Sequence, residues 1–258
     1  MFRTIALLLL SFTLTGCPLF NSDSKSDEVK SGRAVMIIGV DISGSYKNSS
    51  YYKDSMNFIA HYIFAHLKGL KGMDVPDQLF VGSIGGAKPN QPKTFFPIEA
   101  FQYKSIDQIL AKLNEIFPAH DTNQFTDFNA FFEQISTLVQ NRKLVMRPIS
   151  IILLSDGKPD TPKVDGKRDF RSFNFEGLET LSRNVTIRLL YTDAETGDSW
   201  QTKIPRKRVR VWTQDATVMK DWNDKDIVLA GKAFEEQDRL FDWIKNNVDF
   251  QVRVTRID

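Results

Sequence analysis

Three oxygen-bearing side chains follow the first long apolar segment of this 258-residue chain. Asp41, Ser43 and Ser45 stand at alternate positions directly after the mostly apolar residues 35–40. Carboxylate and hydroxyl oxygens are hard ligands, and a set without sulfur or imidazole suits Mg²⁺, Mn²⁺ or Ca²⁺ rather than zinc or copper. A strand end followed by an ordinary Ser/Gly turn would look the same. The pattern therefore predicts a metal site only together with further ligands.

Two more polar positions stand at the ends of predicted elements. Asp156 follows a second apolar segment, residues 149–154, and Thr126 and Asp127 precede an amphipathic pattern over residues 128–139. Helix capping alone would explain Thr126 and Asp127, because a helix N-terminus favours such side chains. Ligands of open α/β sheets bind beyond the carboxyl ends of the strands. Such a sheet could gather these positions and the first three at one edge.

The elements that must position these residues alternate between strands and helices. Apolar runs and amphipathic periods predict strands over 35–41, 78–84, 94–98, 149–154, 184–192, 209–213 and 250–254, and helices over 52–67, 106–117, 128–139, 173–181 and 233–245. Pro97 places the third of these strands at an edge, because proline cannot donate to a sheet ladder. Strand–helix alternation predicts an α/β fold with a mostly parallel central sheet and helices on both faces.

Three motifs in chain order resemble those of the von Willebrand factor type A (vWA) domain. DISGS follows the first strand, TDFNAF opens a helix, and LSDGKPD follows a later strand. They match the metal-ion-dependent adhesion site of that family, and the resemblance covers about residues 33–225. It implies a three-layer, Rossmann-like fold.

The resemblance also implies a ligand set and a partner. Asp41, Ser43, Ser45, Thr126 and Asp156 match the ligand positions of the family, which predicts bound Mg²⁺, or Mn²⁺ or Ca²⁺ in its place. Asp127 is expected to cap a helix or to contact the ligand residues without binding the cation itself. A cation held largely by neutral hydroxyls keeps an open coordination position, so the expected further ligand is an Asp or Glu of a partner protein.

Three features depart from the family pattern. Gln124 and Phe125 precede Thr126, where the family often has glycines. The first helix starts late, and residues 212–231 form a longer final connection than is usual in the family.

The first 32 residues carry the features of an exported, lipid-anchored protein. Arg3 precedes the apolar residues 5–14, and Leu14-Thr15-Gly16-Cys17 resembles a bacterial lipobox. This predicts a signal peptide over 1–16, an acylated Cys17 that inserts into a lipid bilayer, a flexible linker over 17–32 and a vWA domain with a C-terminal extension over 33–258. The resemblance further implies the cell envelope of a Gram-negative bacterium, at the outer membrane and facing the periplasm. Predicted export and a formal net charge of +2 disfavour a nucleic-acid partner.

Other functions fit the sequence less well. Ser155 and Lys158 match S-x-x-K, but S-D-N and K-T-G are missing and Gly157 interrupts the helix that this motif should open. A metal-assisted hydrolase could use the same oxygen ligands, but no residue near the three motifs is suited to act as its general base. A module that binds an envelope polymer remains the second non-enzymatic hypothesis. We therefore expect a binding protein and not an enzyme.

A basic cluster precedes the predicted strand over 209–213. It consists of Arg206, Lys207, Arg208 and Arg210. Such a cluster is typical of a solvated sheet edge that discourages strand pairing, and attraction to anionic headgroups is the functional alternative.

Overall fold

The computed structural model describes residues 33–86, 88, 90–118, 125–161, 163–164, 166–250 and 256–257. The predicted signal peptide, Cys17 and the linker lie outside the described residues, as does the predicted final strand except for Phe250. In the described part of the chain, no helix is long and apolar enough to cross a membrane.

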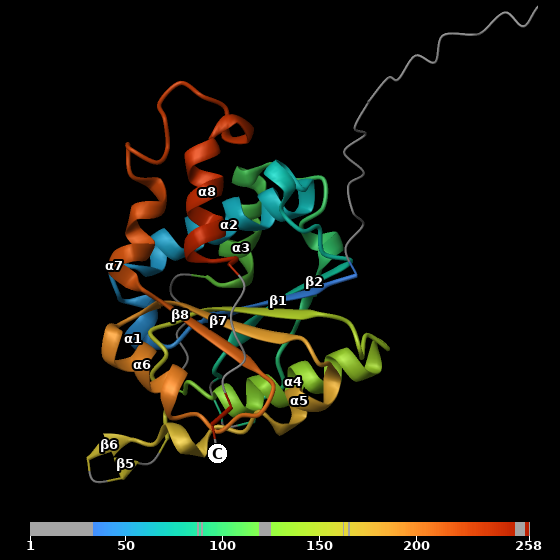
Figure 1. Cartoon of the computed structure of the whole chain (residues 1–258), viewed down its shortest axis with the longest axis vertical. Helices are drawn as coiled ribbons and strands as arrows, with labels where there is room; N and C mark the ends of the chain where they lie inside the picture. The colour runs from blue at the N-terminus through green and yellow to red at the C-terminus, as the bar shows by residue number, and fades with distance from the viewer. Residues whose placement is uncertain are drawn as a thin grey trace, which may run out of the picture.

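Six strands form the central sheet (Figure 1). They are β1 (Val35–Asp41), β2 (Gln78–Ile84), β3 (Phe96–Pro97), β4 (Ile149–Leu154), β7 (Val185–Thr192) and β8 (Arg210–Asp215), in the order β3-β2-β1-β4-β7-β8. All neighbouring strands pair in parallel except β3, which pairs antiparallel with β2 at the edge and contains Pro97. The short strands β5 (Lys163–Val164) and β6 (Lys167–Arg168) form a separate hairpin. The predicted α/β class, the mostly parallel sheet and the edge position of Pro97 are confirmed.

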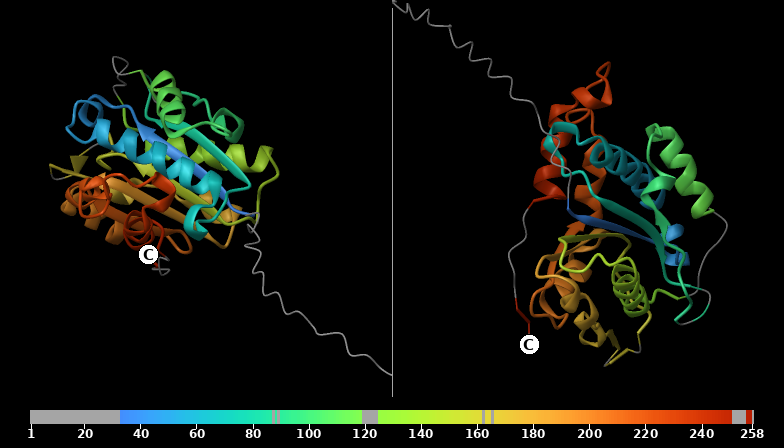
Figure 2. Two further views of the ribbon diagram at one scale, coloured as in Figure 1. Left: turned by 90° about the horizontal axis from the view of Figure 1, so that it is seen from above. Right: turned by 90° about the vertical axis from the view of Figure 1, so that its right-hand side faces the viewer.

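Helices cover both faces of this sheet (Figures 1 and 2). The first face carries α1 (Gly44–Lys47), α2 (Tyr52–Lys68), α3 (Ile106–Ile116), α7 (Ala216–Met219) and α8 (Asp238–Asn247); the second carries α4 (Phe128–Asn141), α5 (Glu176–Leu181) and α6 (Ala194–Thr202). Short 3-10 turns occupy Leu70–Gly72, Ile98–Ala100, Phe170–Ser172, Lys220–Asn223 and Phe234–Glu236. Side chains of β1 alternate between the two cores: Met36 and Ile38 pack with α2, whereas Ile37 packs with α4. Two apolar cores on opposite faces explain why the strands are almost uniformly hydrophobic.

Some helices differ from their predictions. Helix α1 was not expected, because its four residues are too short for a periodic pattern; Ser43 caps it by accepting a bond from the Tyr46 amide at 3.4 Å. Helix α6 was also missed, since it is anchored by the single fully buried Trp200 and has no apolar stripe. Helix α8 begins at Asp238, after a 3-10 turn, rather than at 233. Residues 212–231, which form the longer final connection noted in the sequence, include the end of β8, α7 and a turn in which Trp222 is buried.

The strand order indicates at which edge of the sheet a ligand is expected to bind. The chain builds outward from β1 through β2 in one direction and from β4 through β7 in the other. Open α/β sheets bind ligands at the carboxyl edge where the strand order reverses. Here that point lies between β1 and β4, and Asp41 ends the first of these strands.

Candidate metal centre

The loop after β1 folds around its own polar side chains. The Ser43 amide donates to Asp41 Oδ1 at 2.8 Å, and the hydroxyl oxygens of Ser43 and Ser45 lie 3.1 Å apart. Asp41 and Ser43 are buried, whereas Ser45 is exposed. The three side chains predicted from the first motif therefore lie together, with Ser45 toward solvent.

The loop after β4 is bonded to the first loop. The Ser155 hydroxyl donates to Asp41 Oδ2 at 2.5 Å and accepts from the Gly157 amide at 2.9 Å. Asp156 follows directly and is half-buried, and its Oδ1 accepts from the Lys158 amide at 3.0 Å. The adjacency of β1 and β4 thus brings the aspartates of the first and third motifs to the same edge.

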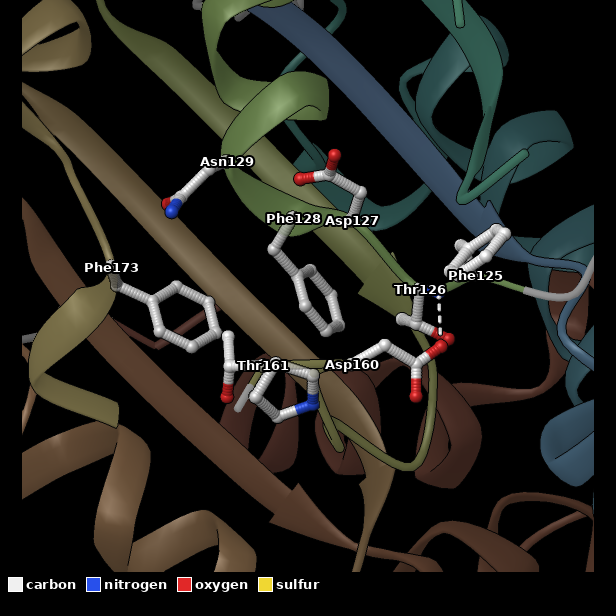
Figure 3. A pocket seen from close by; sticks show the side chains of 9 residues that line it. Phe125, Thr126, Asp127, Phe128, Asn129, Asp160, Thr161 and Phe173 are labelled. Carbon is white, nitrogen blue, oxygen red and sulfur yellow. Dashed lines mark hydrogen bonds between the residues drawn. The ribbon is translucent and has the colours of Figure 1, made fainter. Parts of the chain in front are cut away.

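Thr126 in the second loop is bonded to the same third loop. Its amide donates to Asp160 Oδ2 at 2.8 Å, and the Asp160 amide donates to the Thr126 carbonyl at 3.2 Å (Figure 3). Thr126 is buried. Asp127 caps α4 by accepting from the Ala130 amide at 3.0 Å, which is the capping role expected for it.

Two glycines permit these loops to approach the sheet. Gly85 has a φ of +83°, and a Cβ there would lie 2.1 Å from the Phe125 carbonyl oxygen. Phe125 also bridges Gly86 through backbone bonds of 3.0 and 3.3 Å. The second loop is therefore held against the end of β2, although Phe125 stands where the family often has glycine. Gly157 has a φ of +75°, and a Cβ there would lie 2.6 Å from Leu189.

A small hollow adjoins the second and third loops. It has a volume of about 140 Å³, and its walls include Phe125, Thr126, Pro159, Thr161 and Phe173 (Figure 3). Phe125, one of the residues that line this hollow, is exposed.

The comparisons with known proteins concern structure alone. No protein-family model matches the chain, and no curated relative matches it in sequence. Similar solved structures include a von Willebrand factor type A protein from Catenulispora acidiphila, at 12% identity over 74% of this chain and 41% of that chain, with a TM-score of 0.45. Manganese-loaded TRAP protein from Plasmodium vivax aligns at 16% identity over 71% and 69% of the two chains, with a TM-score of 0.46. Proximal thread matrix protein 1 from the mussel byssus, with a zinc-occupied MIDAS motif, aligns at 17% identity over 74% and 45%, with a TM-score of 0.42. The chain spans less than half the length of the first and third of these proteins.

The sheet order, the two helical layers and the three motifs at one edge are those that the sequence resemblance implies. The chain has a three-layer, Rossmann-like α/β fold with a mostly parallel central sheet.

The carboxylates at this edge of the sheet lie in an environment that disfavours negative charge. Burial raises the pKa of Asp41 to about 6, although hydrogen bonds from Ser155 and Ser43 lower it. Burial also raises the pKa of Asp156, and the charge of Asp156 adds to the shift of Asp41. A cation beside both groups would favour their ionised forms.

The oxygen donors at this edge fit a small hard cation. Octahedral Mg²⁺ with bonds of 2.0–2.1 Å places neighbouring ligand oxygens about 2.9 Å apart. The Ser43 and Ser45 hydroxyl oxygens already lie 3.1 Å apart in the loop. Among the residues that the structure describes, no three His, Cys, Asp or Glu side chains form a possible metal cluster. The donors at the carboxyl edge are instead hydroxyls together with Asp41 and Asp156.

Several residues that support the candidate site were not among the predicted ligands. Ser155 holds Asp41, Asp160 holds Thr126, and the Thr192 hydroxyl donates to the Asp156 carbonyl at 3.0 Å. Their position within the third motif or at a strand end was visible in the sequence. Their partners were not, because each bond joins elements from distant parts of the chain.

Proposed function

We propose that this protein is a binding module that captures a protein partner through a divalent cation. Asp41, Ser43, Ser45, Thr126 and Asp156 would hold the cation at the carboxyl edge of the sheet. Mg²⁺ is the favoured ion, and Mn²⁺ or Ca²⁺ could take its place. We propose a binding role and no catalysis.

One observation carries this proposal. The Ser155 hydroxyl joins the third loop to Asp41, and the backbone of Thr126 is bonded to Asp160 of that same third loop. These bonds support a common site for the three motifs at the β1–β4 edge, where ligands of such sheets bind. Three separate turns supply only hard oxygen donors.

The partner's contribution follows from the donor chemistry. Neutral hydroxyls reduce the charge of a divalent cation less than carboxylates do, and when bound the ion supplies an electrophilic centre. An Asp or Glu carboxylate from outside is the complementary ligand. Ser45 is the exposed member of the set, so the partner would approach from its side.

We also propose that the module is attached to the bacterial envelope through acylated Cys17. The support is the sequence around Cys17 and the polar segment over residues 17–32, which would act as a spacer. The outer membrane, on its periplasmic side, is the proposed location.

Thermal unfolding with and without metal tests the cation site. An ion that binds only the folded protein at a hundredfold excess over its Kd stabilises it by about 2.7 kcal/mol, which raises the Tm by about 5–10 °C. We expect this rise when EDTA is replaced by Mg²⁺ or Mn²⁺, and its loss in Ser43→Ala/Ser45→Ala. Ser50→Ala, which removes an exposed hydroxyl from the same segment, should keep the rise. An equal rise of the Tm in the double variant would contradict the proposed cation site.

Capture of a partner from envelope extract separates the protein-binding and polymer-binding hypotheses. We expect Asp41→Ala and EDTA each to abolish retention of a protein partner on the immobilised full chain. If Asp41→Ala instead leaves binding to purified envelope polymer intact and no chelator-sensitive protein is retained, the polymer hypothesis is favoured.

A further inference from the structure

A second cavity lies at the opposite, amino edge of the sheet. It has a volume of about 440 Å³ and is lined by the first residues of β1, β4, β7 and β8 together with parts of α2 and α8. Both helices cover the same face of the sheet (Figure 1). Pockets for small molecules have volumes of about 300–1,000 Å³. The cavity is therefore large enough for a small organic ligand.

Strand register explains how polar side chains come to line this cavity. Met36, Ser150, Thr186 and Arg210 are level with one another across β1, β4, β7 and β8. Because side chains alternate along a strand, Arg188 lies on the same face as Thr186. The face of the sheet that packs against α2 and α8 is apolar further along its strands. At the amino edge it instead carries two arginines, Arg188 and Arg210, and the hydroxyls of Ser150 and Thr186.

Arg188 is a buried cation whose hydrogen-bond partners are neutral, although its charge also acts on the Asp249 carboxylate. Its guanidinium donates to the Ser150 hydroxyl at 3.0 Å and to backbone carbonyls at the end of α8, including that of Val248 at 2.5 Å. These bonds hold the guanidinium in place and leave its positive charge in the wall of the cavity.

Arg210 offers a donor that the described protein does not use. Its Nη1 donates to Asn184 Oδ1 at 2.7 Å, but its Nε is buried and has no acceptor among the described residues. A buried N–H without an acceptor is unfavourable, since it has lost its water and gained nothing. Arg210 lines the cavity, and a shift of its side chain would bring this N–H to an acceptor bound there.

The remaining charges around the cavity do not reverse the preference for an anion that Arg188 and Arg210 give it. Asp249 is already bonded to His66 at 3.1 Å and to the Tyr62 hydroxyl at 2.5 Å. Its charge is therefore matched within the wall by protonated His66 and by Arg188, whose charge also lowers the pKa of Asp249. Asp74 and the ammonium group of Lys245 contribute opposite charges at the cavity.

We propose that this cavity binds a small organic anion, with a carboxylate or phosphate group at Arg210 and Thr186 and an apolar body against Met36 and Met73. The positive charge of Arg188 also attracts the anionic group of the ligand. This inference does not depend on the cation site at the other edge of the sheet.

Calorimetric titration of the full chain tests the proposal, in EDTA and at constant ionic strength so that the cation site does not contribute. The probes are phenyl phosphate, benzoate, inorganic phosphate and benzyl alcohol. We expect phenyl phosphate or benzoate to bind at least tenfold more tightly than inorganic phosphate, and benzyl alcohol not to bind. The stronger of the two organic anions identifies the preferred head group. Equal binding of benzyl alcohol, or no binding of either organic anion, overturns the proposal.

Matched variants locate the binding. Arg210→Gln should weaken binding of the preferred anion by tenfold or more. Arg208→Gln removes the same charge from an exposed position two residues away and should change the affinity less than twofold. Equal losses in the two variants would mean general charge attraction and would overturn the site. If Arg210→Gln fails to fold, Thr186→Val decides: a loss of threefold or more supports the site, and an unchanged affinity refutes it.

Discussion

Ser155 connects the first and third loops through one hydroxyl group. It is fully buried, donates to Asp41 Oδ2 and accepts from the Gly157 amide. Asp41, Ser43 and Ser45 could be predicted as candidate ligands from residue type and spacing alone. The role of Ser155 could not, because it depends on β1 and β4 lying side by side although Asp41 and Ser155 are 114 positions apart.

Replacement of Ser155 by alanine should destabilise the protein through Asp41. The carboxylate would lose a buried hydrogen bond, and bonds to charged groups contribute about 1.5–3 kcal/mol. We expect the free energy of unfolding, measured by urea denaturation at pH 7 in EDTA, to fall by about that amount. Ser136→Ala is the matched control, since this buried hydroxyl donates only to the Phe132 carbonyl within α4 and its loss should be nearly neutral. Equal effects of the two variants would contradict the role of Ser155.

At the scale of elements, prediction from sequence succeeded where the hydrophobic pattern is regular. The runs in β1, β2 and β4 and the stripes in α2, α3 and α4 were recognised because many residues repeat the same preference. Helices α1 and α6 depend instead on a polar cap and on one buried tryptophan, which sequence periodicity does not reveal. The basic cluster was interpreted as a solvated edge, yet Arg206 is buried and its guanidinium donates to the Trp200 carbonyl at 3.2 Å.

The third loop depends on a glycine between β4 and α6. Gly157 has a positive φ, its carbonyl accepts from Trp200 Nε1 at 2.8 Å, and a Cβ there would lie 2.6 Å from Leu189. A left-handed conformation costs a non-glycine residue about 1–3 kcal/mol, and overpacking adds about 1–3 kcal/mol.

Gly157→Ala should therefore lower the free energy of unfolding by about 2–6 kcal/mol, measured by urea denaturation. Gly231→Ala is the control for backbone strain alone, because its φ is +81° but nothing lies within 4 Å of the added Cβ. If both variants lose the same stability, the close approach of the third loop to Leu189 and Trp200 contributes nothing.

At the scale of the whole molecule, the two edges of the sheet differ in chemistry. The carboxyl edge gathers hydroxyls and carboxylates, whereas the amino edge gathers Arg188, Arg210, Lys245 and His66 beside Asp74 and Asp249. The first edge could be predicted because its residues occur in three short motifs. The second could not, because the starts of four strands and the C-terminal halves of two helices contribute to it, and no two of these elements are neighbours in sequence.

The contact of His66 with Asp249 joins α2 to the end of α8 and should make stability depend on pH. Burial alone would lower the pKa of His66, but the charge and hydrogen bond of Asp249 outweigh it and raise the pKa above 6.5. The same contact with His66 outweighs burial in lowering the pKa of Asp249. A histidine with a raised folded-state pKa stabilises fully below the unfolded value of about 6.5 and loses this contribution as the pH rises through the folded value. For Asp249 the contribution is present above about 3.8 and is lost only at lower pH.

Urea denaturation in EDTA between pH 7.5 and 8.5 isolates the histidine, because Asp249 is ionised well below that range and Asp41, with a pKa of about 6, is almost fully ionised there. We expect the free energy of unfolding to fall with rising pH, by at most about 1.4 kcal/mol per pH unit, and His66→Gln to remove this component. His61→Gln is the matched control on the same helix. Burial lowers the pKa of His61, so this group titrates below pH 6.5 and its replacement should leave the slope unchanged. A slope that persists in His66→Gln would show that the contact between α2 and the end of α8 does not carry the pH dependence.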